Sequence, residues 1–251
     1  MKRLLVILAF MIVAINHCYS QGFDWQYSVR FPSPSPQLFI GINYNYQLSL
    51  NNINIDFKEN GIPSGTFNEA HSSSNKYGIS SEYWLNSGTQ ALTFSLNYHS
   101  MNANLRAVPD PIYYKNDTIY TEITNKNALT YLDLSAYYKH RFPQSHFSIS
   151  AGIIANIFLD NSSSYTENIT SENRTFNNGE RSREILNACT SDYFAIIINP
   201  SLRLSYDFPI ANNVYATVFA DYSMNINSLL RNHVWKNNNF SLGISIFKSI
   251  Y

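Results

Sequence analysis

The chain has 251 residues, 14% of them charged and 15% aromatic, and its 17 lysines and arginines balance its 17 aspartates and glutamates. This neutral balance argues against a nucleic-acid-binding protein, which would carry a basic excess. The high aromatic and low charged content argues against intrinsic disorder. The length allows one large all-β domain or two small domains.

The N-terminus predicts an exported protein. Lys2 and Arg3 precede an unbroken apolar run over residues 4–15, which is too short for a membrane anchor and typical of a signal peptide. Cys18 and Ser20 place small residues at positions −3 and −1, so we expect cleavage between Ser20 and Gln21. Because no later run reaches the length of a transmembrane helix, a membrane protein of this sequence has to be a closed barrel.

This cleavage divides the chain into a signal peptide (1–20), an extended periplasmic lead-in (21–36) that contains a proline-rich run, and a barrel (37–251). Lipidation of Cys18 is one alternative, and retention of the segment as an anchor is another. Cleavage would leave Cys189 as the one cysteine of the mature protein, so no internal disulfide is expected.

The dominant pattern after the signal is an alternation of apolar and polar residues with a period of two. From Leu38 to Leu50 the even positions are apolar, and the odd positions from Gly41 to Ser49 are Gly, Asn, Gln and Ser. The pattern recurs seven more times, and no convincing helix follows the signal. The eight predicted strands cover 38–50, 77–85, 92–99, 132–139, 147–157, 196–207, 214–223 and 240–246.

The connections between these segments alternate between long and short. A soluble meander has no reason to place every long loop at one edge, whereas transmembrane β-barrels have short periplasmic turns and long outer loops. Within the second long loop, residues 112–121 are predicted to form a small hairpin. The predicted long loops are 51–74, 101–126, 161–191 and 226–238, and the short ones are 87–90, 143–145 and 208–212.

The alternation alone does not decide which face points inward. In a soluble calycin-like barrel or sandwich the apolar face would form the interior, whereas in a membrane barrel it would contact lipid. Strand length, aromatic residues toward the strand ends and a final strand ending in Tyr251 favour the membrane form. We therefore predict an all-β, eight-stranded antiparallel up-and-down transmembrane β-barrel in the cell outer membrane, with periplasmic termini and extracellular long loops.

An eight-stranded barrel has an interior that side chains fill, so we predict a plugged lumen rather than a pore. The charged residues of the polar face should pair there, because unpaired buried charges are costly. A narrow ion path or a proton-linked gate is the functional alternative to simple neutralisation. The predicted network consists of the cations Lys139, Arg141 and Arg203 and the acids Glu82, Asp133, Asp207 and Asp221.

His99 and Ser100, at the outer end of the third predicted strand, are the catalytic candidates. A His, a Ser and a carboxylate could activate a hydroxyl group, as in a lipid A-modifying outer-membrane enzyme, although no spacing here is distinctive. His71 and His233 have no Cys or His partner at ligand spacing. We expect no enzyme, no cofactor and no metal, and His99 is interpreted as a polar rim residue.

The final strand, residues 240–251, looks like that of small outer-membrane β-barrel proteins. The segments 131–142 and 147–153 resemble PorT-like barrels of the Bacteroidetes, and the Asn- and Tyr-rich composition is similar. The resemblance covers residues 36–251. It implies the fold and the outer-membrane location, an accessory role in secretion, and recognition of Tyr251 by the outer-membrane assembly machinery.

The favoured hypothesis is a non-enzymatic outer-membrane barrel with a side-chain-filled lumen, whose outer loops bind a ligand, a surface or a partner. A secretion-accessory component is one alternative, and a lipid A-modifying enzyme is another. The expected partners are outer-membrane lipid, the assembly machinery and another envelope or secretion protein, with no nucleic acid.

Overall fold

A computed structural model describes residues 38–59, 62–85, 89–114, 117–142, 145–172, 174–186, 192–211 and 214–250. The predicted signal peptide, its cleavage site and the lead-in lie outside these described residues, as do Cys189 and Tyr251. Within the described residues no helix has the length and hydropathy needed to cross a membrane.

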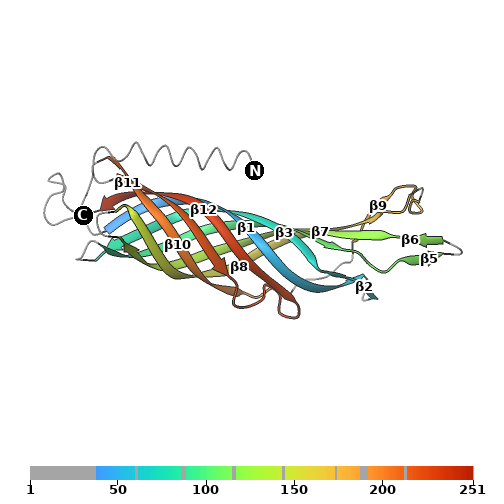
Figure 1. Cartoon of the computed structure of the whole chain (residues 1–251). Coiled ribbons are helices and arrows are strands. Elements are labelled where there is room, and N and C mark those ends of the chain that lie inside the picture. The colour runs from blue at the N-terminus through green and yellow to red at the C-terminus, as the bar shows by residue number, and fades with distance from the viewer. Residues whose placement is uncertain are drawn as a thin grey trace.

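Eight long strands form a closed antiparallel ring (Figure 1). Each strand pairs with the next along the chain, and the ring closes because β1 pairs with β12 and β8 pairs with β10. The prediction of an all-β, eight-stranded up-and-down barrel is confirmed. The strands of the ring are β1 (Leu38–Glu59), β3 (Glu69–Trp84), β4 (Gln90–Ala107), β7 (Thr121–Arg141), β8 (Phe147–Ile169), β10 (Ile196–Ala211), β11 (Val214–Met224) and β12 (Val234–Ile250).

Four short strands lie at one end of the ring. β2 (Ile62–Phe67) pairs with β1, and β9 (Ser182–Glu184) pairs with β8. β5 (Ile112–Tyr114) and β6 (Asp117–Ile119) form the hairpin that the sequence predicts in this region. Figure 1 shows these strands at the end opposite the C-terminus, and we call this the outer end.

The predicted bounds of the long loops are wrong over most of their length. β1, β4 and β8 run on through residues predicted as loop, and β2, β3 and β7 begin or lie within such residues. The cause is that the apolar residues move from even-numbered to odd-numbered positions along the strand. In β1 the apolar positions are even up to Leu50, but Ile53, Ile55 and Phe57 are odd, and they point inward with exposed fractions of 6% or less.

β4 and β7 change phase in the same way. In β4, Leu96 and Tyr98 point outward, whereas Met101 and Leu105 point inward. β1, β4 and β7 therefore each have an inner half with an apolar outer wall and an outer half with a largely apolar interior. At about 3.3 Å per residue and a tilt of about 40°, residues 38–50 rise about 30 Å, the thickness of a bilayer's hydrocarbon core.

The outer half has a hydrophobic core, the outer plug. The segment between β11 and β12 folds inward to complete it, since Leu229 and Leu230 are 2% and 1% exposed. The backbone N–H of Leu229 donates to Trp235 O (2.8 Å), and that of Phe194 donates to Leu229 O (2.9 Å). The outer plug comprises Ile53, Ile55, Phe57, Phe67, Met101, Ala103, Leu105, Ala107, Ile123, Leu129, Tyr131, Tyr165, Ile185, Ile197, Leu229, Leu230 and Trp235.

A smaller cluster, the inner plug, closes the other end of the lumen. It consists of Phe39, Trp84, Ala91, Tyr215 and Phe247. The Tyr215 ring packs edge-on against Phe39 at 5.1 Å and stacks on Phe247 at 5.1 Å between ring centroids. Between the two plugs the interior is polar, so the described lumen has apolar contacts at both ends and charged groups between them.

Glycines allow large rings to lie against the barrel wall. Gly152 on β8 is directly opposite Tyr137 on β7. A Cβ atom at Gly152 would lie 2.2 Å from the carbonyl oxygen of Ala136 and 2.6 Å from the Tyr137 ring. A ring covering a cross-strand glycine in this way helps to fix strand register.

Gly152→Ala should destabilise the folded barrel by about 1–3 kcal/mol, because the added methyl group overpacks the wall and displaces the Tyr137 ring. Denaturant unfolding of the detergent-refolded protein, followed by tryptophan fluorescence, measures this change. Ser162→Ala, on an exposed position of the same strand, is the control and should be neutral. Equal midpoints for the two variants would contradict the tight contact.

Candidate functional site

Lys139 is the centre of a buried charge cluster next to the inner plug. Its Nζ atom lies 3.1 Å from Glu82 Oε2 and 2.9 Å from Asp207 Oδ2, and all three side chains are 2% exposed. The Tyr215 hydroxyl donates to Glu82 (2.5 Å), and the Thr217 hydroxyl donates to Asp207 (2.7 Å). This lysine thus bridges two carboxylates from different strands and ties β3, β7 and β10 together across the lumen.

Arg203 and Asp221 form a second pair on the neighbouring strands β10 and β11. Arg203 Nε and Nη2 contact the two carboxylate oxygens at 2.6 and 3.0 Å, the forked geometry that arginine makes with a carboxylate. The guanidinium lies between two rings, 4.3 Å from the Tyr137 ring centroid and 4.0 Å from that of Phe219. These contacts fill the lumen around the pair.

Asp133 forms a third cluster with partners that the predicted network lacks. Lys76 Nζ lies 2.8 Å from Asp133 Oδ2, and His99 Nδ1 lies 3.1 Å from each carboxylate oxygen. The amide of Asn156 also donates to Asp133. Lys76 precedes Tyr77 and continues the inward positions of its strand, so extending the alternation by one residue would have found it.

Arg141 is also buried, and its guanidinium lies over the Trp84 ring, 4.7 Å from the ring centroid. With Lys76 included, the described charges between the two plugs balance. Four cations, Lys76, Lys139, Arg141 and Arg203, face four anions, Glu82, Asp133, Asp207 and Asp221.

The structure corrects the interpretation of His99 as a polar rim residue. β4 continues for eight residues beyond it, so His99 lies inside the lumen at 4% exposure. Ser100, the next residue along the strand, points to the opposite face, as successive strand residues do. The two side chains therefore cannot act together on one substrate, and the proposed catalytic pair is not assembled.

Within the part of the chain that the structure describes, no cluster of three or more His, Cys, Asp and Glu side chains could hold a metal ion. The expectation of no cofactor and no metal stays a prediction.

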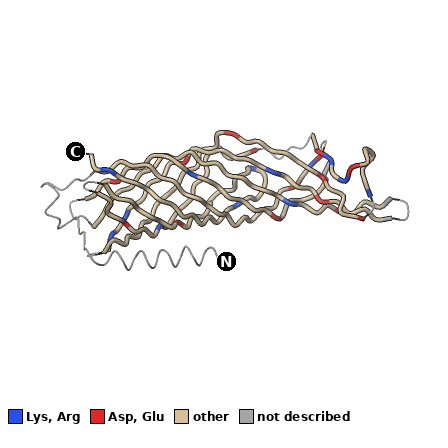
Figure 2. Tube along the Cα trace, turned by 90° about the horizontal axis from the view of Figure 1, so that it is seen from above, with Lys and Arg blue, Asp and Glu red and all other residues tan. Residues whose placement is uncertain are grey.

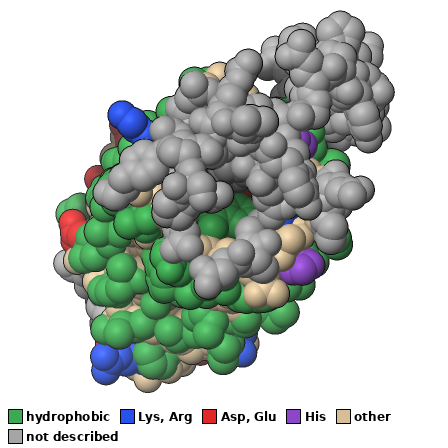
Figure 3. All heavy atoms as spheres, turned by 90° about the vertical axis from the view of Figure 1, so that its left-hand side faces the viewer, with side chains coloured by type: hydrophobic (Ala, Val, Ile, Leu, Met, Phe, Trp, Pro, Cys, Tyr) green, Lys and Arg blue, Asp and Glu red, His purple; other side chains and the backbone are tan. Residues whose placement is uncertain are grey.

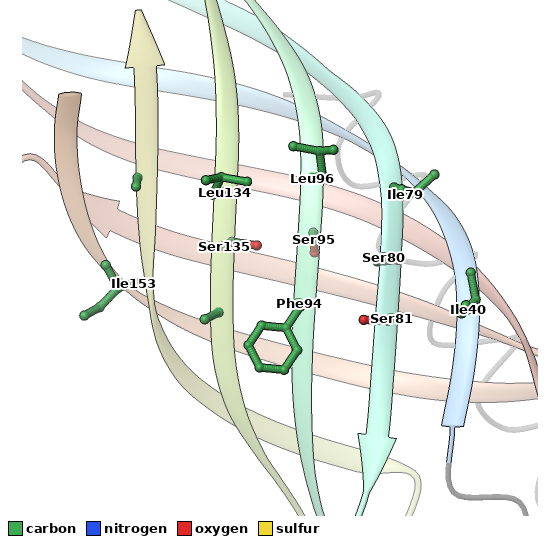
Figure 4. A pocket seen from close by; sticks show the side chains of 12 residues that line it. Ile40, Ile79, Ser80, Ser81, Phe94, Ser95, Leu96, Leu134, Ser135 and Ile153 are labelled. Carbon is green, nitrogen blue, oxygen red and sulfur yellow. The ribbon is translucent and has the colours of Figure 1, made fainter. Parts of the chain in front are cut away.

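The outer wall of the inner half carries an open apolar groove of about 520 Å³. Ile79, Leu96 and Leu134 are cross-strand neighbours in one row of this wall (Figure 4). In the adjacent row Phe94 stands between the small residues Ser81 and Ala136, which leaves the hollow. Viewed from the short-turn end, hydrophobic side chains cover much of the visible wall (Figure 3). The groove is thus part of a continuous apolar surface.

The outer end carries a cleft of different chemistry. This outer cleft has a volume of about 550 Å³ and lies among the upper parts of β1, β2, β7, β8 and β9. Arg183 of β9 crosses one side of it, with Nη2 3.0 Å from Glu59 and 2.6 Å from Glu167. Figure 2 shows charged residues gathered at this end. The residues of the outer cleft fall within predicted loops, so no local sequence pattern points to it.

No protein-family model and no curated protein matches this chain, so the resemblance to PorT-like barrels rests on sequence segments and composition and has no support from these comparisons. Among solved structures, neisserial surface protein A is 12% identical with a TM-score of 0.33, over 83% of this chain and 96% of that one. The attachment invasion locus protein Ail of Yersinia pestis is 11% identical with a TM-score of 0.31, over 84% and 99%. OprG of Pseudomonas aeruginosa is 9% identical with a TM-score of 0.37, over 89% and 100%.

Lys139→Met should destabilise the barrel by about 3–5 kcal/mol, because it leaves Glu82 and Asp207 as buried, uncompensated carboxylates. Denaturant unfolding of the refolded protein checks this. Lys236→Met removes an exposed lysine from β12 and should change stability by less than about 0.5 kcal/mol. Neutralising both acids in the Lys139→Met background should restore part of the loss, and no loss in the single variant would refute the bridging role.

Proposed function

We propose that this protein is a closed, non-enzymatic outer-membrane barrel whose outer half holds a binding surface above the bilayer. The observation that carries the proposal is that the apolar and polar faces of β1, β4 and β7 exchange sides along the length of each strand. The outward side chains are apolar over the inner half and polar over the outer half, while the inward side chains change in the opposite sense.

The inner half supports a membrane location. Its outward residues include large side chains with high exposure, such as Ile42 (64%), Leu50 (65%) and Leu204 (61%). Soluble monomers rarely expose a contiguous apolar surface of this extent. A closed barrel satisfies its backbone hydrogen bonds internally, which lipid requires. In β1, β4 and β7 the polarity changes within a few residues, as expected where strands leave the hydrocarbon layer.

The filled lumen supports a role other than that of an open pore. Paired charges occupy the middle, and apolar clusters occupy both ends. An eight-stranded barrel has little more room than its own side chains need. Binding at the outer end is then the activity that this architecture favours, and we propose that the long connections are extracellular and the termini periplasmic.

Two other functions remain from the sequence. The secretion-accessory role rests on the PorT-like resemblance. It predicts that deletion of the gene blocks export of other proteins, and normal secretion by the deletion strain would count against it. A lipid A-modifying role loses its candidate pair, since His99 and Ser100 face opposite sides of the barrel wall. Recognition of the final strand by the assembly machinery stays a proposal.

Surface labelling tests location and orientation together. In a Cys189→Ser background, Tyr113→Cys in β5 should react with a membrane-impermeant maleimide on intact cells, since Tyr113 is 78% exposed at the outer end. Ser145→Cys, in the short β7–β8 connection, should react only after lysis. Both variants should fractionate with the outer membrane and migrate in a heat-modifiable manner. A soluble protein, or the reverse labelling pattern, would overturn the proposal.

Liposomes containing the refolded protein should not swell in small sugars or amino acids, because plugs and paired charges fill the lumen. A porin in matched liposomes serves as the positive control. Swelling at the porin's rate would show an open path and contradict the closed lumen.

A further inference from the structure

The outer cleft has more negative than positive groups on its walls. Its charged side chains are four carboxylates and two cations, namely Asp56, Glu59, Asp110 and Glu167 with Lys58 and Arg183. Arg183 is already held by two of these carboxylates, at 3.0 Å from Glu59 and 2.6 Å from Glu167. An anionic ligand would therefore have to displace one of these contacts to reach the guanidinium.

The remaining carboxylates lack such partners. Asp56 accepts a hydrogen bond from the Thr66 hydroxyl at 3.0 Å. Asp110 forms no ion pair or hydrogen bond with the residues that the structure describes, and Lys58 is the one cation of the cleft left to balance the two aspartates. The walls thus favour a positively charged occupant.

A buried hydroxyl points to a polar ligand as well. Thr121 lines the outer cleft and is 3% exposed, and its Oγ1 atom has no hydrogen-bond partner among the described residues. A buried hydroxyl is usually satisfied, so this one calls for a partner that arrives with the ligand. Ile112 and Pro109 add an apolar wall beside it.

The geometry argues against a bare divalent ion. Calcium takes six to eight oxygen ligands at short distances. No three acidic or other metal-binding side chains converge in the described part of the chain. The volume of about 550 Å³ is instead that of a pocket for a small organic molecule.

We propose that the outer cleft binds a small organic cation that combines an ammonium group with hydroxyl groups, the chemistry of an amino sugar. The ammonium group faces Asp56 and Asp110, a ligand hydroxyl pairs with Thr121, and the ring lies against Ile112 and Pro109. This assignment rests on the proposed function in that the outer end must be open to the medium.

Two disaccharides that differ in charge test the proposal. Titration calorimetry with the full chain refolded in detergent should show binding of the β-linked glucosamine dimer. The N,N′-diacetylated dimer, which keeps the hydroxyls and loses the positive charge, should bind at least tenfold more weakly. Raised ionic strength should weaken binding of the charged dimer, because the attraction is between exposed charges.

Substitutions in the outer cleft test which residues bind the charged dimer. The double variant Asp56→Asn with Asp110→Asn should weaken the charged dimer at least tenfold, and Thr121→Val should weaken it severalfold. Asp160→Asn, which removes one carboxylate charge at an exposed position of β8 outside the outer cleft, should have no effect. Heat-modifiable migration confirms that each variant is folded.

Absence of binding, equal binding of the two dimers, or full binding by the double variant would overturn the ligand assignment. None of these results bears on the surface labelling of Tyr113→Cys and Ser145→Cys, which tests the proposed function by itself. A correctly inserted protein that binds neither dimer would refute only this further inference.

Discussion

Closure of the ring leaves every strand residue with one of two directions, inward or outward, and the other features of the molecule depend on this constraint. The surroundings of the barrel wall change along each strand, but successive side chains continue to point alternately inward and outward. Side chains on both faces must therefore change character at the same level. Leu50 and Ile53 mark that level in β1, where the apolar side chains move from the wall to the interior.

The polar lumen of the inner half follows from the same constraint. With apolar residues on the outer wall, the remaining positions point inward and bring charges with them. These charges are far from water, so each requires a partner. Lys139 bridges Glu82 and Asp207, and Asp133 gathers Lys76 and His99. Pairing across the lumen also joins strands that are not neighbours in the sheet, which stiffens the ring.

The sequence alone was sufficient for the eight-stranded ring and for the two faces of the inner half, because alternation with a period of two is a local property. It was insufficient for the outer half, where the apolar residues of β1 move from even to odd positions and the run of even apolar positions stops at Leu50. His99 was misplaced for this reason, since β4 continues beyond it. The outer cleft is formed by segments far apart in the chain, and no local sequence pattern shows that these segments come together.

The length of β1 has a consequence for the route by which a ligand arrives. Asp56 lies six residues beyond Leu50, which at the same rise and tilt is about 15 Å higher. The headgroup layer adds only about 5–7 Å to the hydrocarbon core on each side. An occupant of the outer cleft therefore approaches from the aqueous phase or from the polymers of a neighbouring surface. Lateral diffusion within the bilayer would not deliver it.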